Sequence, residues 1–341
     1  MGQVMTTVLE YLNQEPLRFI VSAGAILFLV LNLAAVFTMA ERKVSAYIQL
    51  RYGPNRVGPR GLLQPAADVV KLFSKENVSP SRADLWIFLI APIAMFLPAA
   101  VVWMVVPFAP NAVVADLNVA VVFFIAITSI GALGLIMAGY GSRSTFSLLG
   151  AMRGAAQMIS YEVPLILSLL GVIMLSGSLS LVDIVNAQDG GFWHWYFLPQ
   201  LPMFIVFYIA GIAEARRVPF DLPEGESEIV GGFMVEYSGM TWGLIQAAEF
   251  ASMGLISAIT ATLFLGGWQP PIEALDLGNF NWIWFGLKTS LLVFTFQWIR
   301  WSVPRLRMDQ LMDFGWKVLV PVCLVWLFVT AGLMLLLPSV F

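Results

Sequence analysis

Long apolar stretches dominate this sequence and restrict what it can fold into. Several of them exceed about 18 residues and carry few charged side chains, as bilayer-spanning helices must. The chain of 341 residues is 59% hydrophobic and only 11% charged, a composition that a soluble domain could not solvate. Strict apolar–polar alternation over about ten residues is absent, which argues against a transmembrane β-barrel. We therefore expect an all-α polytopic membrane protein.

The apolar stretches predict eight membrane-spanning helices in a single membrane domain, residues 1–341. The expected spans are 17–40, 85–106, 117–140, 161–176, 198–215, 237–265, 282–301 and 314–338. An even number of spans places both termini on the same side of the membrane.

Basic residues are concentrated in the connections after the first, third, fifth and seventh expected spans. These four connections hold all of the 18 lysines and arginines except Arg18 and Lys288. Because loops rich in lysine and arginine stay on the cytoplasmic side, we expect these connections to be cytoplasmic. Both termini are then on the non-cytoplasmic side.

The first cytoplasmic connection, residues 42–84, contains a predicted amphipathic helix at 62–73. Its apolar residues recur at helical spacing, with Asp68 and Lys71 on the polar side. A helix of this kind lies among the lipid headgroups. It could be a surface anchor and nothing more, or it could wall the mouth of a cavity that opens to the lipid.

Acidic residues stand close to the ends of the spans, and one lies inside a span. Glu41 ends the first span and Glu162 begins the fourth. Glu214 closes the fifth span, and Glu249 lies well inside the sixth, where a charge costs about 2.5–3.5 kcal/mol on insertion scales. We interpret these residues as candidates for proton exchange. The alternatives are an ion pair of Glu214 with Arg217 at helical spacing, an interfacial place for Glu162 and a structural role for Glu249.

The connection at residues 216–236 is the second concentration of acid. Glu224, Glu226 and Glu228 alternate along it, and Glu236 stands at its end. Glycines and prolines interrupt the backbone among them, and irregular backbone beside a membrane is tolerated where it lines a wet cavity or meets another protein. These carboxylates could be a solvated acidic face, or they could exchange protons along a hydrated chain with coupled titrations.

Several cofactor classes are excluded by what the sequence lacks. One cysteine, Cys323, and one histidine, His194, are too few for an iron–sulfur cluster or for a haem with ligands on facing helices, and we predict no metal site. A Gly-Lys-Ser/Thr nucleotide loop is missing as well. If the chain takes part in redox chemistry, it binds a diffusing carrier and a partner delivers the electrons.

Several short segments carry a family resemblance that runs in order along essentially the whole chain. They are AERK at 40–43, RYGPNRVG at 51–58, GLLQPAADVVKLF at 61–73, AQMISYEV at 156–163, PFDLPEGESE at 219–228, EYS at 236–238 and PRLRMDQLM at 304–312. Together they are similar to the H subunit, the quinone-channel membrane subunit, of proton-pumping NADH:quinone oxidoreductase, respiratory complex I.

The resemblance implies a subunit that forms the quinone channel and the first acidic part of the proton-translocation path. It places these residues at the channel or its rim: Glu41, Arg42, Asp68, Lys71 and Arg217. It places these residues in the proton path: Glu162, Glu214, Glu249, Glu224, Glu226, Glu228 and Glu236.

The resemblance also implies what surrounds the chain. Quinone is the substrate, and NADH, FMN and the Fe–S clusters belong to partner subunits, so the isolated chain is inactive. The partners are the hydrophilic-arm subunits at the quinone site, the small membrane subunits and the lipid bilayer, with no nucleic acid. The membrane is an energy-transducing one, expected to be a bacterial cytoplasmic (inner) membrane.

Two departures and two alternatives remain open. The family often has Asn where this chain has Arg216, and usually has Tyr where it has Met308. The equivalent subunit of a ferredoxin- or F420-linked dehydrogenase, or of a membrane-bound hydrogenase, would have much the same sequence. A stand-alone ion transporter would show internal repeats and helices broken in mid-membrane, and neither is evident in the sequence.

Overall fold

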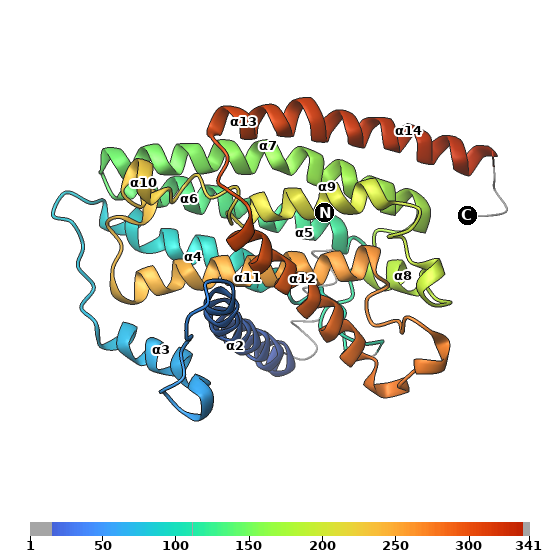
Figure 1. Cartoon of the computed structure of the whole chain (residues 1–341), viewed down its shortest axis with the longest axis horizontal. Helices are drawn as coiled ribbons and strands as arrows, with labels where there is room; N and C mark the ends of the chain where they lie inside the picture. Colours follow the sequence, from blue (N-terminus) through green and yellow to red (C-terminus); the bar gives the residue numbers. More distant parts are fainter. Residues whose placement is uncertain (1–15, 111, 337–341) are drawn as a thin grey trace.

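A computed structural model describes residues 16–110 and 112–336, and helices account for the regular structure in those ranges (Figure 1). The predicted all-α fold class is therefore confirmed for the described chain. The longer helices are α2 (Pro16–Ile48), α4 (Leu85–Val102), α7 (Thr145–Ser176), α9 (Leu201–Glu214), α11 (Gly239–Phe264), α12 (Trp282–Ser302) and α14 (Val320–Leu336). The shorter helices are α3 (Gln64–Ser74), α5 (Ala120–Thr128), α6 (Ile130–Gly141), α8 (Leu181–Asn186), α10 (Glu226–Ile229) and α13 (Met308–Phe314).

Six helical segments within the described residues are long and apolar enough to cross a membrane. They are Val21–Ile48, Leu85–Val102, Ala120–Gly141, Thr145–Ser176, Gly239–Phe264 and Met308–Leu336. The fifth expected span appears as the 14-residue apolar helix α9, and the seventh appears as α12, which lies outside this set. The chain is thus a membrane protein with several apolar helices, while the count of eight spans stays a prediction.

Three helix boundaries differ from those that hydropathy indicated. Helix α2 continues to Ile48, beyond the expected end at residue 40, so Glu41 and Arg42 lie on a helix. Helix α7 begins at Thr145, well before residue 161, so Arg153 is helical rather than in a connection. Hydropathy marks the apolar part of a helix, and both helices extend beyond it. The third expected span is interrupted at Ser129, between α5 and α6, which the sequence did not indicate.

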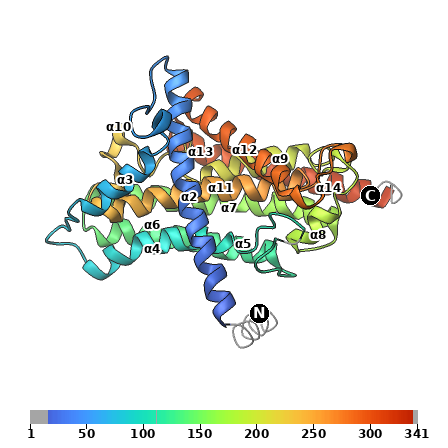
Figure 2. The ribbon, with the colours of Figure 1, turned by 90° about the horizontal axis from the view of Figure 1, so that it is seen from below.

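Helix α11 is the centre of the bundle. Helices α2, α4, α9 and α12 all pack on it, and most of its residues are buried, as expected for a helix that is apolar on all sides. Figure 2 shows α2 crossing the other helices steeply. Small residues permit this approach: a Cβ on Gly254 would lie 2.5 Å from the ring of Phe37 on α2, and one on Gly211 of α9 would lie 2.4 Å from Ile256.

Helix α3 lies against α2 and α11, at the edge of the bundle (Figure 1). Leu72 is its contact with α11, where it leaves no room for a Cβ at Gly243. The side chains of Val70 and Phe73 are 68% and 69% exposed, so its apolar face is directed away from the protein. A helix is present in this part of the first connection, while its amphipathic role at the membrane surface stays a prediction.

Candidate functional site

The acidic loop, residues 216–236, is fixed to the bundle through helix α7. The buried side chain of Gln157 donates from Nε2 to the carbonyl of Ala213 at 2.8 Å and to that of Phe220 at 2.7 Å. Gln157 thereby satisfies carbonyl groups near the end of α9 and in the loop, which would be costly to leave unpaired in the interior. The start of the loop is held in one position relative to α7.

Two glycines of α7 make room for the same loop. A Cβ on Gly150 would lie 2.8 Å from Cα of Gly232 and 2.9 Å from the carbonyl oxygen of Pro223. One turn later, a Cβ on Gly154 would lie 2.7 Å from Cγ of Pro223. The Gly-xxx-Gly pair at 150–154 therefore serves packing of the acidic loop inside this chain.

Glu41, Arg217 and Arg300 form a buried ion cluster between α2, the acidic loop and α12. Nη1 of Arg217 donates to Oε2 of Glu41 at 3.0 Å, and Arg300 donates to the other oxygen. Glu41 is 8% exposed and Arg217 is 4% exposed. The guanidinium of Arg217 also lies 4.2 Å from the ring centroid of Phe250 on α11. A buried charge requires such partners. For Arg217 they are the opposite charge of Glu41 and the aromatic ring of Phe250.

Glu249 extends this cluster towards Glu224. Oε2 of Glu249 lies 3.7 Å from Nη2 of Arg217, and the Glu249 and Glu224 carboxyl groups are hydrogen-bonded to each other. Ionised carboxylates only accept hydrogen bonds, so this contact needs a proton on one of the two groups. Burial, together with the neighbouring Glu249, raises the pKa of Glu224 well above its usual range. The surroundings of Glu224 therefore favour its protonated form beside Glu249.

Asp221 is a further buried carboxylate, and its place in the site was not predicted. Its Oδ2 accepts from Nη2 of Arg305 at 2.9 Å, while the side chain is only 8% exposed. Burial raises the pKa of Asp221 to about 6; Arg305 opposes this rise and the Glu249 charge adds to it. Asp221 and Glu249 therefore act on each other electrostatically.

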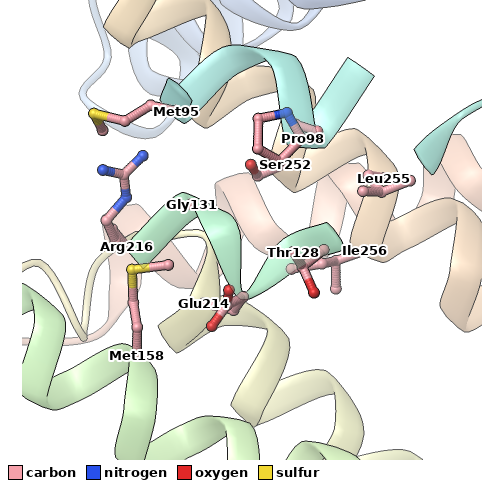
Figure 3. A pocket seen from close by; sticks show the side chains of 11 residues that line it. Met95, Pro98, Thr128, Gly131, Met158, Glu214, Arg216, Ser252, Leu255 and Ile256 are labelled. Carbon is pink, nitrogen blue, oxygen red and sulfur yellow. The ribbon is translucent and has the colours of Figure 1, made fainter. Parts of the chain in front are cut away.

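Glu214 and Arg216 lie on one small internal cavity, which Figure 3 shows from close by. The cavity has a volume of about 30 Å³, and Thr128 and Ser252 add hydroxyl groups to its lining. This is room for about one or two water molecules, and the lining has polar groups to bind them. Arg216 is 6% exposed, and its Nε and Nη1 have no hydrogen-bond partner within the described ranges. Its guanidinium lies 5.5 Å from the ring centroid of Phe233.

Glu162 lies beside the break between α5 and α6. The hydroxyl of Ser129, the residue at the break, donates to Glu162. The Glu162 carboxylate is near enough to Glu214 to repel it. Arg217, which helical spacing offered as the partner of Glu214, contacts Glu41 and Glu249 instead.

Residues expected at the channel rim form a separate group at the junction of α2 and α3. Nη1 of Arg42 lies 2.5 Å from Oδ2 of Asp68, and Nε2 of Gln64 donates to the other oxygen at 3.1 Å. Lys71 is exposed on α3. The pair joins α3 to the end of α2 that carries Glu41.

The remaining predicted acids are farther from the ion cluster. Glu228 is exposed and accepts from Arg153 of α7 at 2.8 Å. Glu236 is half-buried at the end of the acidic loop. The side chain of Glu226 lies outside the described part of the structure, although its backbone forms the start of α10.

The structure therefore brings together four of the predicted residues and adds partners that the predictions missed. Glu41, Arg217, Glu249 and Glu224 converge from three parts of the chain. The missed partners are Arg300, Arg305 and Asp221. In the sequence, both arginines indicated only that their connection is cytoplasmic. Asp221 stands in the PFDLPEGESE segment, and this position could have indicated that it belongs to the site. Across residues 16–110 and 112–336, no group of three or more His, Cys, Asp and Glu side chains has the arrangement of a metal site.

The fold and this site define a class: a helical membrane protein with a buried network of carboxyl and guanidinium groups beneath an acidic loop. Comparison with known proteins agrees with this class and identifies the family. The NADH dehydrogenase family model matches residues 21–331. The chain is 76% identical over 327 residues to the H subunit of NADH-quinone oxidoreductase from Rubrobacter xylanophilus, across 96% of this chain and 99% of the relative. It is 50% identical over 312 residues to the H subunit from Rhodospirillum rubrum, across 90% and 91% of the two chains.

The chain belongs to the NADH dehydrogenase family, as the membrane-embedded H subunit of a complex I-type NADH–quinone oxidoreductase.

Proposed function

We propose that this chain forms the quinone channel of the complex and the first acidic part of its proton path, coupling quinone reduction to proton pumping. The observation that carries the proposal is the buried arrangement of the Glu224 and Glu249 carboxyl groups beside the Arg217 guanidinium, which raises the pKa of Glu224 and suits it to hold a proton. A proton shared by two buried groups moves when a nearby charge changes. Quinone reduction at the loop side supplies such a change, because it consumes protons.

A second set of contacts supports a channel at α2, α3 and α11. The Arg42–Asp68 pair joins α3 to α2, and Leu72 joins α3 to α11. The apolar face of α3 is exposed next to these contacts. This arrangement suits a wall that has lipid on one side and the polar headgroup of a quinone on the other. Glu41 and Arg217 are buried behind this wall, and Lys71 is exposed on α3.

We further propose the following surroundings for the subunit. It spans the bacterial cytoplasmic membrane eight times, with the four basic connections on the cytoplasmic side and both termini on the other side. The acidic loop faces the hydrophilic-arm subunits, which hold FMN and the Fe–S clusters and take electrons from NADH. Small membrane subunits receive protons from the buried acids. The chain has no redox cofactor of its own and is inactive alone.

Replacing Glu249 with Gln in the assembled complex tests the proton role. Gln retains the size of the side chain and one acceptor oxygen but cannot exchange a proton. We expect the complex to assemble and the rate of quinone-linked proton pumping to fall about tenfold or more, since positioned acid–base groups contribute about 10²–10⁴ to rates. The measurements are quinone reduction and acidification of the lumen in proteoliposomes.

Asp313→Asn is the matched control. Asp313 is an exposed carboxylate that pairs with Lys317 at 2.7 Å, away from the buried network. It should leave both rates unchanged. Full pumping by the Glu249→Gln complex would refute the proton role of this residue.

The sequence is also compatible with two other functions. Helices α5 and α6 are separated only by Ser129, which keeps helical backbone angles and donates to the half-buried Glu162, so this interruption does not favour a stand-alone ion transporter. The relatives named as subunits of NADH–quinone oxidoreductase favour the complex I role over that reading and over a ferredoxin- or F420-linked enzyme or a membrane-bound hydrogenase. Transport by the isolated chain in liposomes would support the transporter.

A further inference from the structure

A large cavity lies on the side of the bundle away from the acidic loop. It has a volume of about 950 Å³ and is formed between α2 and α12, which pack on each other and on α11 (Figure 1). Its walls come from Leu29 and Leu33 of α2, Phe285 of α12 and Trp103 and Phe108 beyond α4. Most of the lining is apolar, so the cavity is suited to an apolar ligand.

The two helices that form this cavity also carry exposed apolar side chains that suit lipid. Phe28 on α2 is 71% exposed, and Leu287 and Leu291 on α12 are 55% and 58% exposed. Exposed apolar residues of this size belong in contact with lipid in a membrane protein. A lipid molecule could therefore enter the cavity directly from the bilayer.

The cavity also has two polar features at different depths. At its rim, Oδ1 of Asp276 accepts from Nδ2 of Asn281 at 2.8 Å and from the Gly278 N–H at 3.0 Å. These hydrogen bonds lower the pKa of Asp276, so the rim carries a negative charge. Farther in, the hydroxyl of Thr289 lines the cavity and has no hydrogen-bond partner among the residues described, although Thr289 is only 7% exposed.

These two features indicate the chemistry of the ligand. A buried hydroxyl left without a partner is costly, so a ligand that offers an acceptor at Thr289 is favoured. Thr289 lies eight residues after Asn281, about 12 Å along the helix axis. A ligand that reaches both must have a cationic end, an acceptor below it and an apolar remainder. Anionic headgroups are disfavoured by the Asp276 carboxylate.

We propose that this cavity is a binding site for a membrane phospholipid with an ammonium headgroup. One acyl chain lies between α2 and α12, an ester carbonyl accepts from the Thr289 hydroxyl, and the ammonium group faces Asp276. The site is separate from the quinone channel proposed at α3, and it does not depend on that proposal.

Photocrosslinking in the assembled complex tests the site. The complex is reconstituted into phosphatidylcholine nanodiscs that contain a small fraction of phosphatidylethanolamine with a diazirine in one acyl chain. After irradiation and digestion, mass spectrometry should find lipid adducts on residues 281–293 of α12 and 28–37 of α2. The absence of adducts there, for example because another subunit covers the cavity, would overturn the proposal.

A cavity-filling variant makes the test specific. Gly286 lines the cavity, and no described atom would lie within 4 Å of a Cβ added to it, so Gly286→Phe can extend into the space. We expect the adduct to fall about tenfold or more, because each methylene excluded from the cavity contributes about fourfold to binding. Gly332→Phe is the control: Gly332 on α14 is equally open but lies away from the cavity, so the adduct should persist. An undiminished adduct in Gly286→Phe would overturn the site.

The headgroup is tested by comparing probes with the same diazirine chain. The wild-type complex should label about two- to fivefold more strongly with phosphatidylethanolamine than with phosphatidylglycerol, as expected of one exposed ion pair. Asp276→Asn should remove this preference while leaving the site in place. Equal labelling by the two probes in the wild type would contradict the headgroup assignment. Loss of labelling when quinone is added before irradiation would identify the occupant as quinone instead and overturn the proposal.

Discussion

Lys288 and Arg217 are both buried cations, and their surroundings differ in kind. Lys288 on α12 donates to three backbone carbonyl oxygens, those of Leu265 at 2.5 Å, Gln269 at 2.7 Å and Gly267 at 2.9 Å. The ammonium group has three N–H donors, so its capacity is used in full. The Trp195 ring centroid lies 4.0 Å from Nζ and completes the enclosure.

Arg217 has a less complete environment and more charged neighbours. Its Nη1 is hydrogen-bonded to Glu41, but Nε and Nη2 lack a hydrogen-bond partner in the described part of the chain. Glu249 lies 3.7 Å away, and beyond it is the Glu224 carboxyl group. Lys288 thus closes the end of α11 with neutral groups, whereas Arg217 lies among groups whose charge can change. The contrast separates a buried charge that holds structure from one that can respond to chemistry.

Lys288→Met should give the largest effect, and it should be on stability. The thioether cannot donate, so the three carbonyl oxygens of residues 265, 267 and 269 lose their partner. At about 1–3 kcal/mol for each unsatisfied group, the loss is about 3–9 kcal/mol. We expect little assembled complex in the membrane, measured by native gel electrophoresis and by the temperature of inactivation.

Two further variants show whether the hydrogen bonds of Lys288 are the cause. Lys288→Arg keeps N–H donors and should recover part of the assembled complex. Lys317→Met removes an exposed lysine that pairs with Asp313 and should have no effect. Normal assembly of Lys288→Met would show that the three carbonyls find other partners, and the contrast with Arg217 would fail.

Asp221→Asn should change how stability depends on pH. Burial raises the pKa of Asp221 to about 6 in the folded protein, against 3.8 for an unperturbed group. The folded state therefore favours the protonated form of Asp221. The contribution of this preference to stability is complete below pH 3.8 and is lost as the pH rises through about 6. The wild type should lose about 3 kcal/mol relative to Asp221→Asn over this window.

The measurement is residual quinone reductase activity after heating at a series of pH values between 4 and 7.5. The residual activity of the wild type should fall relative to that of Asp221→Asn as the pH rises. Asp309→Asn is the control, because Asp309 has a side chain that is 71% exposed. A difference that stays constant across the window would show that Asp221 titrates as an ordinary carboxyl group.

Sequence patterns were sufficient for the helical class and for most of the long helices, because apolar stretches of this length have few alternatives in a bilayer. They failed where a helix leaves the apolar zone, as at Ile48 and Thr145. They also failed at Ser129, a single residue that separates α5 from α6 although its backbone angles are helical. That interruption is related to a tertiary contact, the hydrogen bond to Glu162, which periodicity cannot detect.

The site was predictable in its residue types but not in its pairings. Buried acids were identified because charge in an apolar helix is costly. Their partners come from elsewhere in the chain: Arg217 meets a residue 176 positions away, and Arg300 meets one 259 positions away. Such pairings depend on how α2 and α12 pack around α11, which hydropathy does not encode. Arg216 was visible as an extra charge, but its burial was not.

Arg216→Gln should give the smallest effect of the three and is a direct test of that extra charge. Arg216 opposes the rise in the pKa of Glu224, so its removal should raise that pKa further. Glu224 would then hold its proton to a higher pH. If the Glu224–Glu249 pair exchanges protons during turnover, the pH profile of quinone-linked pumping should move upward by about one unit or less.

Arg153→Gln distinguishes this effect from a general loss of positive charge. Arg153 pairs with the exposed Glu228 on the surface of the acidic loop, so solvent screens its charge. Its removal should leave the pH profile in place, although the chain loses the same unit of positive charge. Equal shifts in the two variants would mean that the whole loop responds to net charge. A shift in Arg216→Gln alone would assign the response to the buried Glu224–Glu249 carboxyl pair. This pair lies next to Arg217, so the result would support a responsive role for the charges around Arg217.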